Sequence, residues 1–371
     1  MRNGFKIVDT DCHQIEPASM WEDYIDPAFR DRAPRRAQVG TRQAIVVEGK
    51  SLTNEEGKYP MSPPEFLAAV AEGMKRFERA RKSGFGAESR LEDMDEQGVD
   101  AQVIFPTSGG QLLGKPFEDP ELLLACCRAY NDWSREYCQA APERLRWAAM
   151  IPLQHPGLAI EELRRACERG AVGFYVRPNP VEGRNLYHED YEPLWAEVER
   201  SGKPVCFHDS GSPYLPSYGD RMDTHTSGHI IAHPVEAMVA MLSLIWYGVV
   251  ERHPGLRIVH VEADAGWLPY WLQRMEQHWE FSGNAEHPDL KMAPTEYFKR
   301  SFWVACRGDE RTLPSVVELV GDDNLLFNTD YPHPDGTWPW GIDRLCEQKI
   351  PEESKRKIFW DNAARAFALG D

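Results

Sequence analysis

The chain has 371 residues, a length that fits one large α/β barrel as well as two or three smaller domains. Hydrophobic residues make up 42% and charged residues 27%, which excludes a disordered or fibrous chain, and no apolar run approaches the ~18 residues that span a membrane. The net charge of −17 argues against nucleic acids and anionic membranes as partners, and the N-terminus lacks the apolar core of a signal peptide, so we expect a cytoplasmic protein.

Eight apolar runs of strand length recur along the chain, each bounded by turn residues or followed by a helical pattern. They contain Val, Ile, Phe and Ala without alternating polar residues, as expected for strands that are buried on both faces. The predicted strands are Phe5–Asp9, Ala101–Pro106, Arg146–Leu153, Ala171–Val176, Pro204–His208, Arg257–Glu262, Ser301–Cys306 and Asn324–Asp330.

Helical patterns lie between these runs. Pro120–Ala141 and Leu158–Arg169 are amphipathic, and Pro234–Val250 begins at a proline, which is a favoured first helical residue. A final helix is expected over Glu352–Leu369. Eight strands that alternate with helices predict an α/β fold of the (β/α)8 TIM barrel type, and we expect residues 1–371 to form this single domain.

Two stretches break the alternation. Residues 30–85 form a predicted insertion after the first strand, with a hairpin at Gln43–Leu52 and a proline-rich bend at Pro60–Pro64, and they would serve as a lid or an oligomer contact. Residues Asp209–Gly228 follow the fifth strand and are rich in Gly, Ser, Pro and Tyr, which suits a substrate-binding loop.

Polar side chains stand at the ends of several predicted strands. In a parallel barrel these C-terminal ends meet on one face and carry the active site. Asp11 and His13 are two residues apart in an extended segment, so both point to the same side. Together with His208 and Asp330 they provide imidazole nitrogens and carboxylate oxygens, which suit a divalent transition metal.

The same strand ends carry sequence motifs of a known family. The sequence resembles the amidohydrolase-related family, in the branch that contains aminocarboxymuconate-semialdehyde decarboxylase and aromatic-acid decarboxylases, a family that hosts several chemistries. The resemblance covers nearly the whole chain. Its motifs here are Asp9-Thr10-Asp11-Cys12-His13-Gln14-Ile15-Glu16-Pro17, Met94-Asp95-Glu96-Gln97-Gly98-Val99-Asp100, Gly266-Trp267-Leu268-Pro269, Thr329-Asp330-Tyr331-Pro332-His333 and Asn362-Ala363.

The resemblance implies a metal site and shows one departure from the decarboxylases. The metal pattern of the family, His-x-His on strand one, His on strand five and Asp on strand eight, falls on Asp11, His13, His208 and Asp330, with Asp11 in place of the commoner His. The decarboxylases use a His on strand six for acid–base work, and Glu262 stands at that position here. A carboxylate donates protons at neutral pH only if its pKa is raised considerably, so this departure argues against plain decarboxylation.

Glu262 is a natural metal ligand instead, and His229 and His233 are two further candidates. They are four residues apart, which on a helix would place them on one face, but Pro234 disfavours a helical conformation for His233, and we place His233 at the N-terminal edge of the helix. Either these histidines bind a second metal ion with Glu262, or they cap the helix or contact substrate.

Two functions therefore remain open. A carboxylate-rich pair of metal sites without thiolates suits iron or manganese at least as well as zinc, and a few relatives on this fold use dinuclear iron or iron–manganese centres and dioxygen to hydroxylate small molecules. The favoured prediction is such an oxygenase, with O2 as a cosubstrate. The alternative is a mononuclear zinc or manganese hydrolase or decarboxylase of a small aromatic carboxylic acid, in which the metal activates water or polarises substrate.

The remaining predictions concern individual roles. Glu262, Asp330 and His333 are the predicted catalytic residues, and Arg177 and Arg307 either bind a substrate carboxylate or form ion pairs at the rim. Trp338, like Trp340, lines an apolar pocket or anchors the strand-eight loop. Asp9 and Asp335 are expected to support the metal ligands, and His260 either supports them, which is the preferred interpretation, or belongs to the core. The family also implies a homo-oligomer with a small-molecule substrate, and a related partner subunit stays open.

Overall fold

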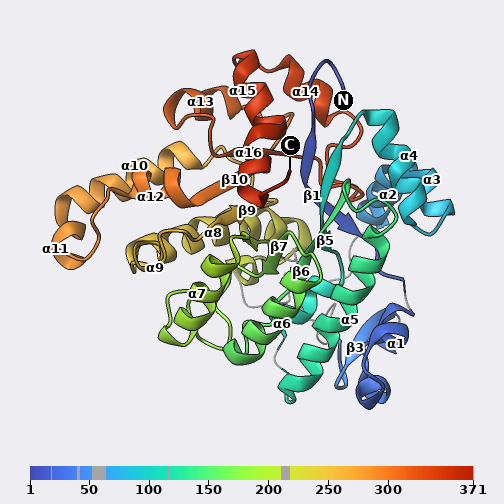
Figure 1. Cartoon of the computed structure of the whole chain (residues 1–371). Helices are drawn as coiled ribbons and strands as arrows, with labels where there is room; N and C mark the ends of the chain where they lie inside the picture. The colour runs from blue at the N-terminus through green and yellow to red at the C-terminus, as the bar shows by residue number, and fades with distance from the viewer. Residues whose placement is uncertain (18, 40–41, 52–63, 116, 210–217, 371) are drawn as a thin grey trace.

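A computed structural model describes residues 1–17, 19–39, 42–51, 64–115, 117–209 and 218–370 (Figure 1). In these residues, eight parallel strands form one sheet in chain order, and helices surround it. The sheet closes between its first and last strands, where Cys12 pairs with Tyr331 and the backbone N–H of Asp330 donates to the carbonyl of Asp11 at 3.0 Å. The predicted (β/α)8 barrel is therefore confirmed.

Each predicted strand has a counterpart in the sheet. The strands are β1 (Val8–Gln14), β5 (Ala101–Pro106), β6 (Leu145–Met150), β7 (Gly173–Val176), β8 (Val205–Phe207), β9 (Ile258–His260), β10 (Phe302–Arg307) and β11 (Leu325–Asn328). The first strand differs most from its prediction, because it begins at Val8 rather than Phe5 and continues to Gln14. All its residues are buried, so Asp11 and His13 lie inside the strand and not after it.

The helices follow the strands around the barrel (Figure 1). They are α1 (Met20–Tyr24), α2 (Pro64–Gly73), α3 (Glu78–Lys82), α4 (Ala87–Gln97), α5 (Pro120–Cys138), α6 (Pro156–Glu168), α7 (Glu192–Ser201), α8 (His225–Trp246), α9 (Val249–Arg252), α10 (Leu268–His278), α11 (Asn284–Glu286), α12 (Pro294–Ser301), α13 (Leu313–Leu319), α14 (Gly341–Glu347), α15 (Glu352–Arg356) and α16 (Asn362–Phe367). The predicted final helix is thus split into α15 and α16, with a π-helical turn between them.

Helix α8 begins nine residues earlier than predicted and contains Pro234 in its interior. The hydroxyl of Thr224 caps it by accepting from the backbone N–H of Ser227 at 3.2 Å. A proline inside a helix costs about 3 kcal/mol, and burial of the apolar side of α8 against the barrel offsets this cost. The expectation that His233 stands at the helix edge is wrong, because His229 and His233 lie one turn apart on the same helix.

The same helix is long and apolar enough to cross a membrane. In the described residues, one such segment is found, Thr226–Trp246, with a mean hydropathy of 1.4. About half of its most apolar window, 56%, is buried inside the protein. Burial of this kind is typical of a core helix of a barrel, which accounts for the hydropathy of α8.

The insertion after β1 contains the predicted hairpin. Strands β2 (Arg35–Val39), β3 (Arg42–Val47) and β4 (Lys50–Ser51) form an antiparallel sheet. The β3–β4 turn is made by Glu48 and Gly49, both with positive φ, the conformation that two-residue hairpin turns favour. Of the predicted bend at Pro60–Pro64, only Pro64 lies within the described residues, where it opens α2. The assignment of residues 1–371 to a single domain stays a prediction.

Candidate metal and active site

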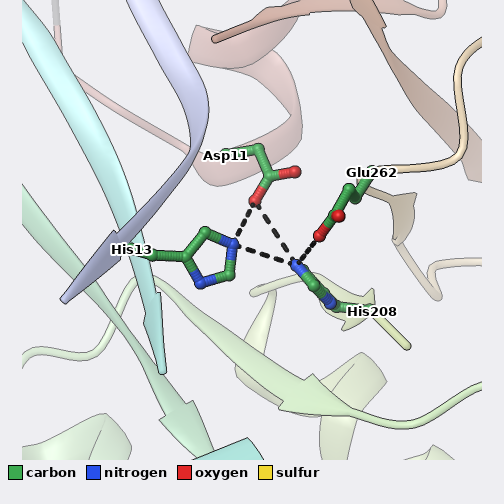
Figure 2. A group of neighbouring side chains, drawn as sticks. All are labelled: Asp11, His13, His208 and Glu262. Atoms are coloured by element: carbon green, nitrogen blue, oxygen red, sulfur yellow. Dashed lines mark hydrogen bonds and ion pairs between the residues drawn. The ribbon is translucent and has the colours of Figure 1, made fainter. Parts of the chain in front are cut away.

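Four buried or nearly buried side chains from three strand ends point toward one another at the mouth of the barrel (Figure 2). The Nε2 atom of His13 lies 3.4 Å from Oδ1 of Asp11 and 3.1 Å from Nε2 of His208. His208 Nε2 also lies 2.9 Å from Oε2 of Glu262. These atoms face a common centre from different sides, which is the arrangement of a cation site.

Asp330 completes this group from the end of β11. Its Oδ1 atom lies 3.5 Å from Nε2 of His13, so the structure brings together the ligand set predicted from sequence: Asp11, His13, His208 and Asp330. Asp330 and Glu262 have φ values of 59° and 50°, in the left-handed region that side chains other than glycine rarely adopt. Backbone strain of this kind collects at functional sites, where the surrounding structure holds it in place.

The two imidazoles are oriented by backbone carbonyls. Nδ1 of His13 lies 2.9 Å from the carbonyl oxygen of Pro106, and Nδ1 of His208 contacts the carbonyl oxygen of Asp209. A proton on each Nδ1 makes these hydrogen bonds and leaves Nε2 facing the centre. This is how proteins fix the tautomer of a metal-binding histidine.

The electrostatics of the cluster fit a divalent cation. Burial, followed by the nearby charge of Glu262, raises the pKa of Asp330 to about 8 and that of Asp11 to about 6. The pKa of His13 is held well below its usual range by burial and by the neighbouring imidazoles, which keeps it in the neutral form that binds metals. Oδ1 of Asp11 is buried without a hydrogen-bond partner, and a bound cation would satisfy it.

Helix α8 adds two imidazoles on the far side of Glu262. Nε2 of His229 and Nε2 of His233 lie 3.4 and 3.6 Å from Oε1 of Glu262. The structure therefore brings the predicted second group together as well. Burial alone would raise the pKa of Glu262, but its imidazole neighbours outweigh burial and hold the pKa well below its usual range. Glu262 is therefore an anion at neutral pH. This agrees with the argument from sequence that a carboxylate at this position does not act as a proton donor unless its pKa is raised considerably.

His333 stands against Asp330 on the other side of the site. Its Nδ1 lies 2.7 Å from Oδ1 of Asp330, and its ring stacks on that of His13 with centroids 4.1 Å apart. Burial opposes a charge on His333, but Asp330 outweighs it and raises the pKa of His333 to about 10. Sequence reasoning missed Thr107, whose Oγ1 lies 3.1 Å from Nε2 of His333.

The position of Thr107 is set by Glu16, which belongs to the opening motif. The carboxylate of Glu16 accepts hydrogen bonds from the backbone N–H groups of Thr107, Ser108 and Gly109 at 3.0 to 3.1 Å. The presence of Glu16 in that motif was the sequence signal for this contact, because a carboxylate at this position can bind the backbone N–H groups of a loop.

Two neighbouring cavities of about 510 and 490 Å³ open at this centre. His229, His233 and Glu262 line both and so form part of the wall between them. The first cavity has a polar floor of His13, His208, Glu262 and His333. Its apolar wall consists of Phe66, Ala69, Val70, Pro106, Ile230 and Pro334. A mainly apolar cavity with a few convergent polar groups is the usual form of a small-molecule site.

The predicted substrate-binding residues occupy different positions. Arg307 lines the second cavity, with its Nε 3.2 Å from Oδ1 of Asp264. Arg177 is buried in an ion pair with Asp209, at 3.1 Å. Trp338 is buried against Tyr331 and is not among the described residues that line the two cavities. Binding of substrate by these three residues stays a prediction.

The residues predicted to support the metal ligands differ in what they contact. The carboxylate of Asp9 accepts from the backbone N–H of Thr329 at 2.9 Å and so holds the backbone between the end of β11 and Asp330. His260 is wholly buried, and its ring stacks with those of Phe207 and Phe302, at 5.5 and 6.0 Å. Of the two interpretations of His260, the structure favours the core and not the preferred supporting role, because its ring packs between aromatic side chains of the barrel.

Cation binding at this site should release protons. His208 and Asp330, with pKa values of about 9 and about 8, hold protons at neutral pH that a cation must displace. The affinity for Mn²⁺ is therefore expected to rise as the pH rises from about 6 to about 9, by up to about tenfold per pH unit for each proton displaced. Calorimetry at pH 7 in buffers of different ionisation enthalpy measures the protons released, and an affinity that does not change with pH would contradict this.

Comparisons with known proteins agree with the geometry. A model of the family described as Amidohydrolase matches residues 8–369. Gamma-resorcylate decarboxylase of Rhodococcus jostii (strain RHA1) is 30% identical over 300 residues, which cover 76% of this chain and 87% of that protein. A crystal structure of an amidohydrolase from Mycobacterium avium subsp. paratuberculosis K-10 superposes with a TM-score of 0.79 at 25% identity, covering 98% of this chain and 99% of the other.

A further solved structure contains a metal ion. It is a dihydroxybenzoic acid decarboxylase from Polaromonas sp. JS666 with bound manganese and the inhibitor 2-nitroresorcinol. Its TM-score is 0.66 at 21% identity, and the match covers 98% of this chain and 97% of that chain.

These relatives correct the functional prediction. Those with a named activity are decarboxylases and not oxygenases, so the favoured prediction of an iron oxygenase is wrong, and the alternative of a decarboxylase agrees with them better. The dioxygen cosubstrate and the second metal ion that accompanied the oxygenase find no support in them. The match over residues 8–369 shows that this chain belongs to the amidohydrolase family.

Proposed function

We propose that this protein is a metal-dependent decarboxylase that converts a small aromatic carboxylic acid to the corresponding arene and CO2. The observation that carries the proposal is the buried group of imidazoles and carboxylates on the floor of a cavity with an apolar wall. Relatives that decarboxylate dihydroxybenzoates support it. Asp11, His13, His208 and Asp330 would hold one divalent ion, and manganese is the first choice because a related enzyme binds it.

Decarboxylation of an arene requires two things of the site. The carboxylate group leaves as CO2, and a proton must reach the ring carbon that carried it. A bound divalent ion supplies positive charge that holds and polarises the oxygen atoms of the substrate. The residues of the chain must then orient the ring, exclude water and deliver the proton.

His333 takes the place of the strand-six imidazole in this proposal. It lines the same cavity as His13 and His208, and its Nδ1 is 2.7 Å from Oδ1 of Asp330. We assign to this pair the proton that is delivered to the ring carbon, with the hydroxyl of Thr107 holding the imidazole at its other nitrogen. Glu262 keeps a different role, because as an anion it orients His208 and the two imidazoles of α8.

A substrate panel tests the proposal directly. Manganese-loaded protein is incubated with 2,6-dihydroxybenzoate, 6-methylsalicylate and 5-carboxyvanillate, the compounds named for its relatives, and CO2 is measured together with the ring product. We expect release of CO2 from at least one of them in equal amount to the ring product, with turnover on the order of 10 s⁻¹. Metal-loaded protein that releases no CO2 from hydroxylated aromatic acids would contradict the proposal. Homo-oligomerisation stays a prediction.

A further inference from the structure

We infer that the apolar face of α2 formed by Phe66, Ala69 and Val70 is the wall of the active site that selects the substrate, and that it binds an apolar substituent on the ring edge opposite the carboxylate. Arg76, in the 3-10 turn Met74–Phe77 that follows α2, fixes this wall to the loop that carries His333. The inference rests on the proposed function, which places the carboxylate of the substrate at the polar floor.

One face of α2 points into the cavity. Phe66, Ala69 and Val70 are spaced as i, i+3 and i+4, the spacing of neighbours on one side of a helix, and all three line the cavity. Leu67 lies on another side of α2, is 54% exposed and is not among the described residues that line the cavity. The helix therefore presents a defined apolar face to a bound ligand.

Helix α8 continues the apolar surface from a different part of the chain. Ile230 lines both cavities and is 69% exposed. In the proposed binding mode, a ligand whose polar groups face His13 and His208 directs its opposite edge toward these apolar residues. An alkyl or aryl group on that edge would bury apolar surface that a hydrogen atom leaves exposed to water.

Arg76 connects the wall to the catalytic loop. Its Nη2 donates to the backbone carbonyls of His333, Pro334 and Gly336 at 3.0, 2.9 and 2.9 Å. The guanidinium group lies 4.9 and 4.8 Å from the ring centroids of Phe77 and Trp340. A planar guanidinium group can donate hydrogen bonds to several carbonyl oxygens and contact two aromatic rings at the same time. An ammonium group cannot reproduce this combination of contacts.

A close backbone approach strengthens the same connection. A Cβ atom added to Gly73, the last residue of α2, would lie 3.0 Å from both Cβ and the carbonyl oxygen of Pro334. Only glycine fits at this distance without displacement of the loop. The end of α2 and the loop after β11 therefore pack as one unit, so a change in the position of the wall changes the position of His333 as well.

A pair of product analogues tests the selectivity of the wall without turnover. Calorimetry on the manganese-loaded protein compares resorcinol with 5-pentylresorcinol, in which the alkyl group is opposite the ring carbon that would carry the carboxylate. We expect the pentyl compound to bind at least about tenfold more tightly. Phe66→Ala should reduce this ratio about fivefold or more, while Leu67→Ala, the matched control on the same helix, should leave it unchanged.

Equal affinity for the two analogues, or equal effects of the two alanine variants, would overturn the assignment of the wall. This result is distinguishable from a failure of the proposed function, because binding is measured in the absence of any CO2 release. A protein that prefers the pentyl compound but decarboxylates none of the acids would support the assignment of the wall and contradict the proposed decarboxylase activity.

Chemical rescue tests Arg76 as a positioning residue. We expect Arg76→Ala to lower kcat about 10-fold to 100-fold with a smaller change in KM, and millimolar methylguanidinium to restore part of the loss. Lys75→Ala is the matched control, because Lys75 is an exposed neighbour that pairs with Glu72 and should leave kcat unchanged. A purely structural role for Arg76 predicts a lower Tm, and no recovery of kcat with methylguanidinium, and that outcome would overturn the connection.

Discussion

Asp330→Asn is expected to lower kcat for decarboxylation by about 10²–10³-fold in a protein that remains folded. The carboxylate serves two groups at once, since its Oδ1 lies 2.7 Å from Nδ1 of His333 and 3.5 Å from Nε2 of His13. Asparagine keeps the shape of the side chain and the backbone hydrogen bond to Asp11, so the barrel should close as before. It removes the negative charge that attracts the metal and that raises the pKa of His333.

Steady-state kinetics on the substrate identified by the panel, together with elemental analysis and circular dichroism, measure these effects. Asp335→Asn is the control, because this carboxylate lines the same cavity but has a side chain that is 62% exposed and lies 3.8 Å from His229. Its effect should stay below about tenfold, as expected for an exposed charge. If the Asp330→Asn protein retains kcat within tenfold of the parent, the assignment of a catalytic role to Asp330 is wrong.

The barrel and its ligand set were predictable for a geometric reason. In a closed parallel sheet all strands end on one face, so polar residues at the ends of separate strands must meet. Asp11, His13, His208 and Asp330 lie hundreds of residues apart in some pairs, yet this rule alone places them together. Little knowledge of loop conformation is needed for such residues, because they lie within a strand or at most two residues after one.

The position of α8 was not predictable from local rules. The residue before a proline avoids the helical region, and that preference suggested a helix start at Pro234. The preference is worth a few kcal/mol, and the cap at Thr224 together with burial of the helix against the barrel outweighs it. Because tertiary packing decided the outcome, the approach of His229 and His233 to Glu262 could be seen only in the folded protein.

The functional error has a related cause. Glu262 stands where decarboxylases carry an imidazole, and the loss of that imidazole was taken as the loss of decarboxylation. His333, already a predicted catalytic residue, was not considered as its replacement, and the structure places it against Asp330 in the same cavity. His333 lies on a loop whose carbonyls are bound by Arg76, 257 residues away in the chain. A contact over such a separation leaves no local pattern in the sequence.

Metal removal should have the largest effect of all. Dialysis against EDTA is expected to abolish decarboxylation, and about one equivalent of Mn²⁺ per chain should restore it. Without a cation, the buried carboxylate of Asp330 lies beside those of Asp11 and Glu262, and its raised pKa of about 8 means that it takes up a proton at neutral pH. The metal should therefore also stabilise the fold, by about 4 kcal/mol at a metal concentration of 1,000 Kd, which appears as a higher Tm.

The number of metal ions per chain distinguishes one metal site at Asp11, His13, His208 and Asp330 from a second site at His229, His233 and Glu262. Elemental analysis of protein grown with iron, manganese and zinc should give close to one ion per chain. Glu262→Gln should keep that ion, because His13, His208 and the two aspartates remain, although the weakened contacts to His208 lower the affinity. Two ions per chain, with loss of one of them in Glu262→Gln, would instead mean that His229 and His233 hold a metal of their own. The imidazoles of α8 would then be ligands, and their orientation by the Glu262 anion would be a consequence of metal binding.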